Sequence, residues 1–364
     1  MNVNAPRLAV VGTGWWSSEF HIPSLTAYDG AELVGLVDSD PERLRRVAEH
    51  YADLPTYSSI DELIAAGAAD GVVIATPSAT HYDVAAKSLA AGLHVMLEKP
   101  MTIDSQQAWE LVDIANTRSL HLTVGLTFQH TRAAQALRRE IRSGAIGELV
   151  AVSGLFASMV EAYYRGFPEQ YEEVFQWSIN GPTAGTYSSN GMAGGGQAFT
   201  QLSHAFGMVL HVCGDPVREV YAKMNYRDLA VDLADAIAYE FWPGAIGTMC
   251  STGNMRPREP HQQEFRYYGT RGYAIQDLVA GTMFVQRADG STMEISGAEV
   301  GEVYPAFEPA RHLADLIAGR CDVNKAPAIE SAWATDALEA AYRSVESRRP
   351  ELATSEEHWT GLNS

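Results

Sequence analysis

The first 124 residues contain five short apolar runs rich in β-branched side chains, and segments long enough to form helices separate them. Apolar strands that alternate with helices are typical of a parallel sheet buried on both faces, because such strands need no polar side. The pattern predicts an α/β fold that begins with a doubly wound parallel sheet of the Rossmann type. The expected strands are Leu8 to Val11, Leu33 to Val37, Gly71 to Ala75, Leu93 to Leu97 and Leu120 to Val124.

The regular alternation then stops and a different organisation begins. One helix (Thr131 to Ser143) and one strand (Leu149 to Ser158) precede a long irregular stretch rich in aromatic residues and glycine. We therefore expect two domains, with boundaries at 1–127 and 128–364. The later part is expected to form the strands Val217 to Asn225, Ala236 to Trp242, Ala245 to Ser251, Gln263 to Tyr268 and Met283 to Arg287, and a closing helix, Ala332 to Ser344.

The irregular stretch has two features of interest. Gly181-Pro182 and the small residues that follow up to Gly196 indicate a flexible surface loop, which we interpret as a lid at a substrate entrance. The stretch also contains an aromatic cluster with one cation, which could stack on sugar rings or pack against a neighbouring subunit. Its members are Tyr163, Tyr164, Arg165 and Trp177.

Composition narrows the possible environments and partners. The formal charge of -19 would repel a phosphate backbone, so we expect no nucleic-acid partner. No apolar stretch approaches the roughly 20 residues that cross a bilayer, and no export signal precedes the first strand, so we expect no membrane association. The three cysteines are odd in number and widely spaced, which favours a reducing cytoplasm.

A glycine-containing turn follows the first expected strand. Gly12 and Gly14 would let the backbone bend tightly and approach a pyrophosphate at the start of the next helix, with Trp15 and Trp16 directly after them. The third small position is Ser17, so the motif alone is equally compatible with an ordinary tight turn. This loop is our expected cofactor-binding turn.

Asp38 ends the second expected strand and favours NAD as the cofactor. A carboxylate there accepts hydrogen bonds from the adenosine ribose and repels the 2′-phosphate of NADP. The alternative is a polar strand end followed by a helix cap, a role that fits Asp40 before Pro41.

Lys99 comes just after the strand Leu93 to Leu97, at the carboxyl edge of the predicted sheet, where open α/β sheets bind ligands. An ammonium group beside a substrate hydroxyl would stabilise the developing alkoxide. The alternative is a surface lysine paired with Glu98.

A second candidate lies on a mostly apolar helical segment over 197–212. Four polar residues recur there at the spacing of one helical face, and polar groups on a buried helix need partners or a ligand. A single histidine in such a helix would more often be a satisfied core residue. The four are Gln197, Thr200, Gln201 and His204.

Several motifs together resemble the Gfo/Idh/MocA oxidoreductases, which include glucose-fructose oxidoreductase and inositol dehydrogenase. They occur in family order along nearly the whole chain: the glycine turn, Thr76-Pro77-Ser78-Ala79-Thr80-His81, Glu98-Lys99-Pro100, Gly144-Ala145-Ile146-Gly147-Glu148 and Gly269-Thr270-Arg271-Gly272. The resemblance implies a Rossmann domain, a second α/β domain with a large and mostly antiparallel open sheet, a nicotinamide between them, a cis Lys99-Pro100 bond, and a homodimer or homotetramer.

The resemblance also implies roles for individual residues. His204 matches the histidine that takes the alcohol proton, and its ordinary pKa near 6.5 suits that task. Two positions depart from the family: Thr200 and Gly207 stand where aspartates are usual, and we expect Thr200 to hydrogen-bond a sugar hydroxyl or the His204 ring. Other expected cofactor contacts are Thr76, Pro77, His81 and Glu98, and other expected substrate contacts are Gln129, Tyr163 and Gln201. We expect no metal site, since the remaining histidines lack ligand spacing.

Three functions are compatible with these residues. We expect an NAD-dependent dehydrogenase that oxidises a secondary hydroxyl of a sugar, glycoside or related polyol, with Lys99 orienting the hydroxyl and His204 as general base. The alternative is an enzyme that retains NAD and cleaves glycosides by transient ring oxidation and elimination. A non-catalytic NAD-dependent sensor is disfavoured, because a sensor needs no proton acceptor.

Overall fold

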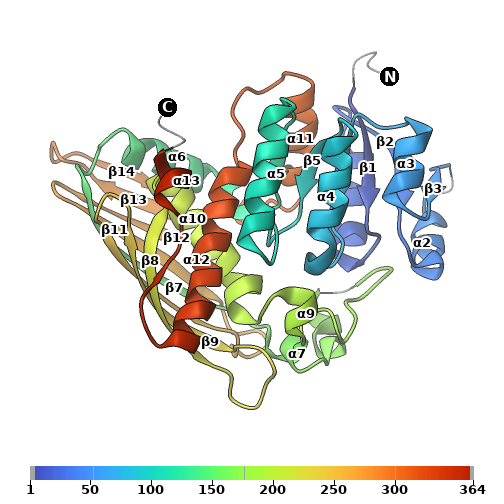
Figure 1. Ribbon diagram of the computed structural model, residues 1–364. Helices are drawn as coiled ribbons and strands as arrows, with labels where there is room; N and C mark the ends of the chain where they lie inside the picture. The colour runs from blue at the N-terminus through green and yellow to red at the C-terminus, as the bar shows by residue number, and fades with distance from the viewer. Residues whose placement is uncertain (1–4, 52, 176, 300, 361–364) are drawn as a thin grey trace.

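The computed structural model describes residues 5–51, 53–175, 177–299 and 301–360. Two sheets dominate it, with helices between them (Figure 1). The N-terminal sheet has six parallel strands in the order β3-β2-β1-β4-β5-β6, which is the doubly wound arrangement. Its strands are β1 (Arg7–Val11), β2 (Glu32–Val37), β3 (Thr56–Tyr57), β4 (Gly71–Ile74), β5 (His94–Leu97) and β6 (Leu122–Val124).

All five strands expected in this half are present, and the short β3 is an addition at the edge. Successive β1 residues pack into different cores, since Leu8 and Val10 join one apolar cluster and Ala9 and Val11 join another. Burial on both faces explains why these strands read as continuous apolar runs. The helices of this half are α1 (Ile22–Thr26), α2 (Pro41–Ala48), α3 (Ile60–Ala66), α4 (His81–Ala90) and α5 (Ser105–Thr117), with the short turns η1 (Ser17–His21) and η2 (Ser78–Thr80).

The second sheet has nine strands in the order β14-β13-β12-β11-β7-β10-β9-β8-β15. Its pairs are antiparallel except for β7 with β10, which confirms a mostly antiparallel open sheet. The strands are β7 (Leu149–Ala157), β8 (Val217–Asn225), β9 (Ala234–Phe241), β10 (Ile246–Thr252), β11 (Gln262–Gly269), β12 (Tyr273–Asp277), β13 (Thr282–Gln286), β14 (Thr292–Ile295) and β15 (Glu351–Leu352).

Buried and exposed residues alternate along β9 and β10, so one face of the second sheet is packed and the other is open. The packed face lies against three long helices, α6 (Arg132–Arg142), α10 (Ser203–Cys213) and α12 (Ala328–Ser347). Short helical segments connect these elements: η3 (Thr127–His130), α7 (Glu161–Tyr164), η4 (Pro168–Tyr171), α8 (Glu172–Phe175), α9 (Asn190–Ala193), η5 (Ala198–Leu202) and α13 (Glu356–Thr360).

One helix of the second half returns to the first sheet. In α11 (Glu308–Ile317), Leu313 and Ala314 pack with Leu8 and Val10, so the helix covers the same face of the Rossmann sheet as α1. The expected boundary at 127/128 thus divides the chain between the two sheets. One helix from beyond the boundary, α11, nevertheless covers the first sheet. Among the described residues, no helix combines the length and apolar character that crossing a membrane requires.

Candidate active site

The turn after β1 has the shape that a pyrophosphate requires. Gly12 has φ +90°, and a Cβ there would lie 2.7 Å from the Ala75 carbonyl oxygen, so glycine is needed where β1 and β4 end side by side. A Cβ on Gly14 would have no heavy atom within 4 Å, which leaves open space in front of the turn. This cradle fits a dinucleotide phosphate at the start of the helical segment that contains η1.

Asp38 lies at the carboxyl edge beside this cradle, where a ribose-binding carboxylate is expected. Its Oδ2 accepts hydrogen bonds from the Thr13 amide at 2.8 Å and the Thr13 hydroxyl at 2.9 Å, and Arg43 Nε donates to the same oxygen at 3.1 Å. Its Oδ1 accepts one bond, from the Asp40 amide. A carboxylate oxygen has two lone pairs, so Oδ1 can accept a ribose hydroxyl as well. Asp40 caps α2 as expected.

The Glu98 carboxylate is buried behind the cradle and is held by three donors. Trp16 Nε1 lies 3.0 Å and His21 Nε2 2.9 Å from Glu98 Oε1, and the Lys99 amide donates to Oε2. Burial alone would raise the pKa of Glu98, but the His21 hydrogen bond and the Lys99 charge outweigh it, so the pKa lies below its usual value. Glu98 therefore remains an anion that balances Lys99.

Lys99 lies directly after β5 and its bond to Pro100 is cis, as the resemblance implied. Its Nζ donates to the Thr200 carbonyl at 3.0 Å, which joins the edge of the Rossmann sheet to η5 of the second half. Burial lowers the pKa of Lys99, and the Glu98 charge opposes part of that shift. A surface lysine is therefore excluded by the fold.

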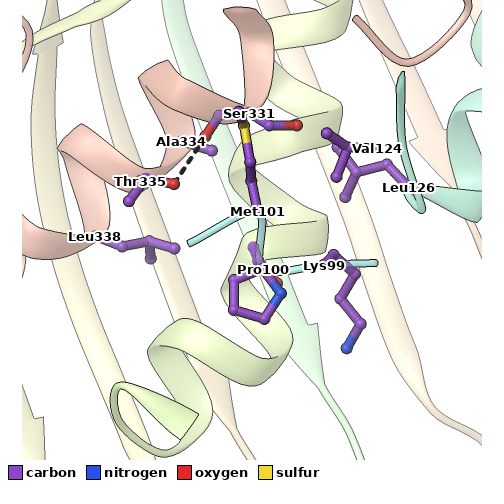
Figure 2. A pocket seen from close by; sticks show the side chains of 10 residues that line it. Lys99, Pro100, Met101, Val124, Leu126, Ser331, Ala334, Thr335 and Leu338 are labelled. Carbon is purple, nitrogen blue, oxygen red and sulfur yellow. Dashed lines mark hydrogen bonds between the residues drawn. The ribbon is translucent and has the colours of Figure 1, made fainter. Parts of the chain in front are cut away.

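On the side that faces α12, the turn that contains Lys99 is tightly packed and leaves no room for a ligand. Figure 2 shows Lys99 extending away from α12, whereas Met101 reaches toward Ser331. The cavity behind the turn measures about 10 Å³, which is no larger than one water needs. The ammonium therefore faces η5 and the side of His204.

His204 lies in the first turn of α10 and is surrounded by aromatic rings. Its ring centroid is 5.7 Å from Phe128 and 6.4 Å from Tyr304. Nδ1 is buried and has no hydrogen-bond partner among the described residues. Burial, and then the Lys99 charge, hold the pKa of His204 well below its ordinary 6.5, so the imidazole is neutral at pH 7 and can accept a proton.

The expected polar stripe does not act as one face. The Thr200 hydroxyl lies 2.5 Å from the Tyr164 hydroxyl and donates to the Gly196 carbonyl, and Gln197 bonds Ser158 and Tyr164. Of the two roles expected for Thr200, the hydrogen bond to the His204 ring is not formed, because the hydroxyl binds Tyr164 and Gly196 instead, whereas the bond to a sugar hydroxyl stays a prediction. The physical reason is the π-helical register of η5, which rotates its side chains relative to α10. Gln201, on the same turn, is partly exposed.

Other expected contacts have different surroundings. Both ring nitrogens of His81 lie 2.8 Å from backbone carbonyls, those of Thr76 and Pro100, so this ring braces the two loops. Gln129 donates to the Gly207 carbonyl of α10, and its Oε1 is buried without a partner among the described residues. Thr76, which is half-buried, and Pro77, which is exposed, lie just before η2.

Tyr163 lies in an aromatic cluster beside the cradle. Its ring packs against Tyr171, Phe175 and Tyr187, and Phe175 in turn lies 6.0 Å from the Trp15 ring. Burial raises the pKa of Tyr163, so its hydroxyl stays neutral. These ring contacts of Tyr163 lie within one chain, and its expected contact with the substrate stays a prediction.

Sequence reasoning missed His21 and Tyr304. His21 has no exposed surface and binds Glu98, and its position nine residues after Gly12 could have suggested a partner for that carboxylate. Tyr304 comes from the segment before α11 and contacts the rings of Trp16 and Phe128. No local pattern places Tyr304 there, because the contact depends on how α11 returns to the first sheet.

Two family models match the chain. Residues 6–126 match one described as an oxidoreductase family with an NAD-binding Rossmann fold, and residues 134–275 match the C-terminal domain of the same family. Together they span most of the chain.

Curated relatives are partial matches. The rhizopine catabolism protein MocA of Rhizobium meliloti is 28% identical over 67% of this chain and 67% of its own length. An inositol 2-dehydrogenase of Corynebacterium glutamicum strain R is 32% identical over 41% of this chain and 44% of its own. A D-glucoside 3-dehydrogenase of Escherichia coli K12 is 24% identical over 76% of this chain and 66% of its own. The chain thus spans less than half of some relatives and about two thirds of others.

Solved structures share the fold over nearly the full length. Levoglucosan dehydrogenase, in complex with NADH and levoglucosan, has a TM-score of 0.77 at 17% identity and covers 96% of this chain and 100% of its own. GenD2 from gentamicin A biosynthesis, in complex with NAD, has a TM-score of 0.76 at 22% identity and covers 98% of both chains. With both halves matched by family models, this chain belongs to the Gfo/Idh/MocA family of oxidoreductases.

Proposed function

We propose that this protein is an NAD-dependent dehydrogenase that oxidises a secondary hydroxyl of a sugar, glycoside or related polyol. The observation that carries the proposal is the meeting of a half-buried lysine at the carboxyl edge of the Rossmann sheet with a buried histidine of α10. Lys99 Nζ donates to the Thr200 carbonyl, one turn before His204, and burial, followed by the Lys99 charge, lowers the His204 pKa. A cation and a neutral base beside a dinucleotide cradle suit alcohol oxidation.

Each residue has a distinct task in this proposal. The ammonium of Lys99 donates to the substrate hydroxyl oxygen and stabilises negative charge as it develops. The neutral His204 imidazole accepts the hydroxyl proton. Gly12 and Gly14 cradle the pyrophosphate and Asp38 accepts from the ribose, and the nicotinamide, when bound, accepts the hydride.

Relatives named for inositol, glucosides and levoglucosan support a carbohydrate as the substrate class. The test is to incubate the purified protein and NAD with a panel of free sugars, inositols and glycosides, while NADH absorbance and product identity are followed. Formation of NADH together with a keto-sugar supports the proposal. Aglycone release without net NADH would support retained-cofactor glycoside cleavage instead, and no reaction across a broad panel, despite NAD binding, would favour a sensor.

We also propose a homo-oligomer in the cytoplasm. The open face of the second sheet carries several large exposed apolar side chains, among them Ile246 (61% exposed) and Tyr268 (42%). A face of this size rarely stays in contact with water, and a second copy of the chain is the partner we propose for it. The free cysteines Cys213, Cys250 and Cys321 are compatible with a reducing compartment.

A further inference from the structure

Residues 177–181, which we call the strap, belong to the irregular segment of the second half but bind to the Rossmann half. In Figure 1 the light-green chain beside α9 reaches beneath the Rossmann sheet toward α2. Asn180 Nδ2 donates to the Thr13 carbonyl at 2.9 Å, between the two glycines of the cradle. Arg46 of α2 donates to Asn180 Oδ1 at 3.0 Å, so one buried amide joins the cradle to α2.

The strap has a second attachment on the other side of the cradle. The Ser178 amide and hydroxyl both donate to the Glu19 carboxylate of η1, at 2.7 Å and 2.6 Å. Ile179, between these polar anchors, packs against the apolar cluster under β1 and α1. The attachments therefore lie on η1, on the glycine turn and on α2.

The strap is also folded on itself in a way that fixes its shape. A Cβ on Gly181 would lie 2.5 Å from the Trp177 ring, so the indole lies directly on this glycine. The paired amide of Asn180 and the apolar contact of Ile179 give the segment defined partners at consecutive residues. A loop that opens to admit substrate needs few such contacts, so residues 177–181 are better described as an attached segment than as a lid.

We propose that the strap is a clamp on the dinucleotide site, and that it slows release of the reduced cofactor at the end of each turnover. The inference rests on the proposed function in one respect, that the cradle binds NAD. Because the strap joins the glycine turn to α2, which follows the ribose-binding Asp38, it crosses the exit of the adenosine half. Cofactor release then requires the hydrogen bonds of Ser178 and Asn180 to break, whereas sugar entry beside Lys99 does not.

The test measures NADH release from the full-length protein by stopped flow, as the loss of energy transfer from tryptophan to NADH when excess NAD is added. We expect Asn180→Ala and Glu19→Gln each to speed release at least tenfold. Asn180→Ala removes one attachment, and Glu19→Gln replaces a charged acceptor of two hydrogen bonds by a neutral amide with one acceptor oxygen. Asp228→Asn is the matched control, because its bonds to Arg165 lie in the same irregular segment and do not reach the Rossmann half. That variant should release NADH at the wild-type rate.

If Asn180→Ala fails to fold, Glu19→Gln still tests the clamp. Thermal melting of every variant shows whether it is folded. Wild-type release that matches and so limits steady-state turnover, with faster release in the strap variants, supports the clamp. Equal release rates in wild type, Asn180→Ala and Glu19→Gln would overturn it while leaving the proposed dehydrogenase intact. A protein that binds no NADH would overturn both.

Discussion

Neutrality of His204 at physiological pH follows from its burial and from the charge of Lys99. If His204 is the general base, as proposed, its pKa should set the acid side of the pH dependence of catalysis. A base whose pKa is lowered gains activity as pH rises through a value below 6.5. At the alkaline end, the lowered pKa of Lys99 places loss of the ammonium below 10.5. We therefore expect a bell-shaped profile of kcat/KM for oxidation, with its acid limb below pH 6.5.

His204→Asn should lower kcat by roughly 10² to 10⁴ and remove the acid limb, because no base is left to titrate. The exposed His50 provides the control, and His50→Asn should keep the wild-type profile. An acid limb that persists unchanged in His204→Asn would assign the proton acceptor to another group.

Asp38 should set the preference between NAD and NADP. A carboxylate facing the ribose repels a 2′-phosphate, so we expect NAD to bind at least tenfold more tightly, or about 1.4 kcal/mol, in a calorimetric titration. Asp38→Ser should narrow this gap, both by relieving repulsion and by releasing Arg43, which lies 3.1 Å from the carboxylate. Adding Arg43→Ala to Asp38→Ser separates the two effects. Equal wild-type affinities for NAD and NADP would contradict the assignment.

Among the elements, α12 carries a buried charge cluster that joins it to α6 and α10. Glu330 accepts from Arg138, Arg142 and His211, and although burial opposes it, these partners lower the Glu330 pKa to about 2. A carboxyl whose pKa is lowered by folding stabilises the fold above its ordinary 4.5 and loses that contribution as pH falls toward 2.

Glu330→Gln should therefore lower the free energy of unfolding at pH 7 by about 3 kcal/mol and flatten its dependence on pH between 4.5 and 2. Glu346→Gln, on an exposed turn of the same helix, is the control and should change little. Denaturant titrations across that pH range make the measurement. If the free energy of unfolding of Glu330→Gln falls with pH as steeply as that of wild type, other carboxyl groups cause the sensitivity to acid.

Elements with a strong local signal were predictable from the sequence, and those defined by distant contacts were not. The bounds of β8 match those of the expected strand, Val217 to Asn225. Its buried and exposed residues partly alternate, which is the pattern that a strand with one packed face leaves in a sequence. By contrast, β12 (Tyr273–Asp277) and β14 (Thr292–Ile295) are short and depend on neighbours for their pairing. The helix α11 was also missed, since its apolar side meets β1 and α1 from some 300 residues earlier.

The same distinction holds within the site. Lys99 and Asp38 could be located because they end apolar strands, and strand ends meet at one edge of a parallel sheet. The orientation of Thr200 could not be predicted. A regular helix would place Thr200 on the same face as His204, whereas the π-helical turn η5 places it on another face. In this turn the Thr200 hydroxyl binds Tyr164 and the Gly196 carbonyl.

At the scale of the whole molecule, the open face of the nine-stranded sheet should hold copies of the chain together. Ile246→Glu places a charge on this face and should shift the protein toward monomer in sedimentation velocity, with little change in melting temperature. Val323→Glu, at a site 63% exposed and away from the sheet, is the matched control. A monomeric wild-type protein, or an Ile246→Glu protein that still associates, would contradict this interface.

Under the proposed function, Lys99 acts on the substrate oxygen in a site built between the two halves of the chain. Single-turnover formation of NADH, from enzyme saturated with NAD and mixed with an active sugar, tests it most directly. In Lys99→Met we expect the rate to fall by roughly 10² or more, because an oxygen-stabilising donor is lost, while NAD affinity stays within about twofold of wild type. Lys87→Met, an exposed lysine paired with Asp61, should behave as wild type. NADH formation at a near-normal rate in Lys99→Met would contradict the account.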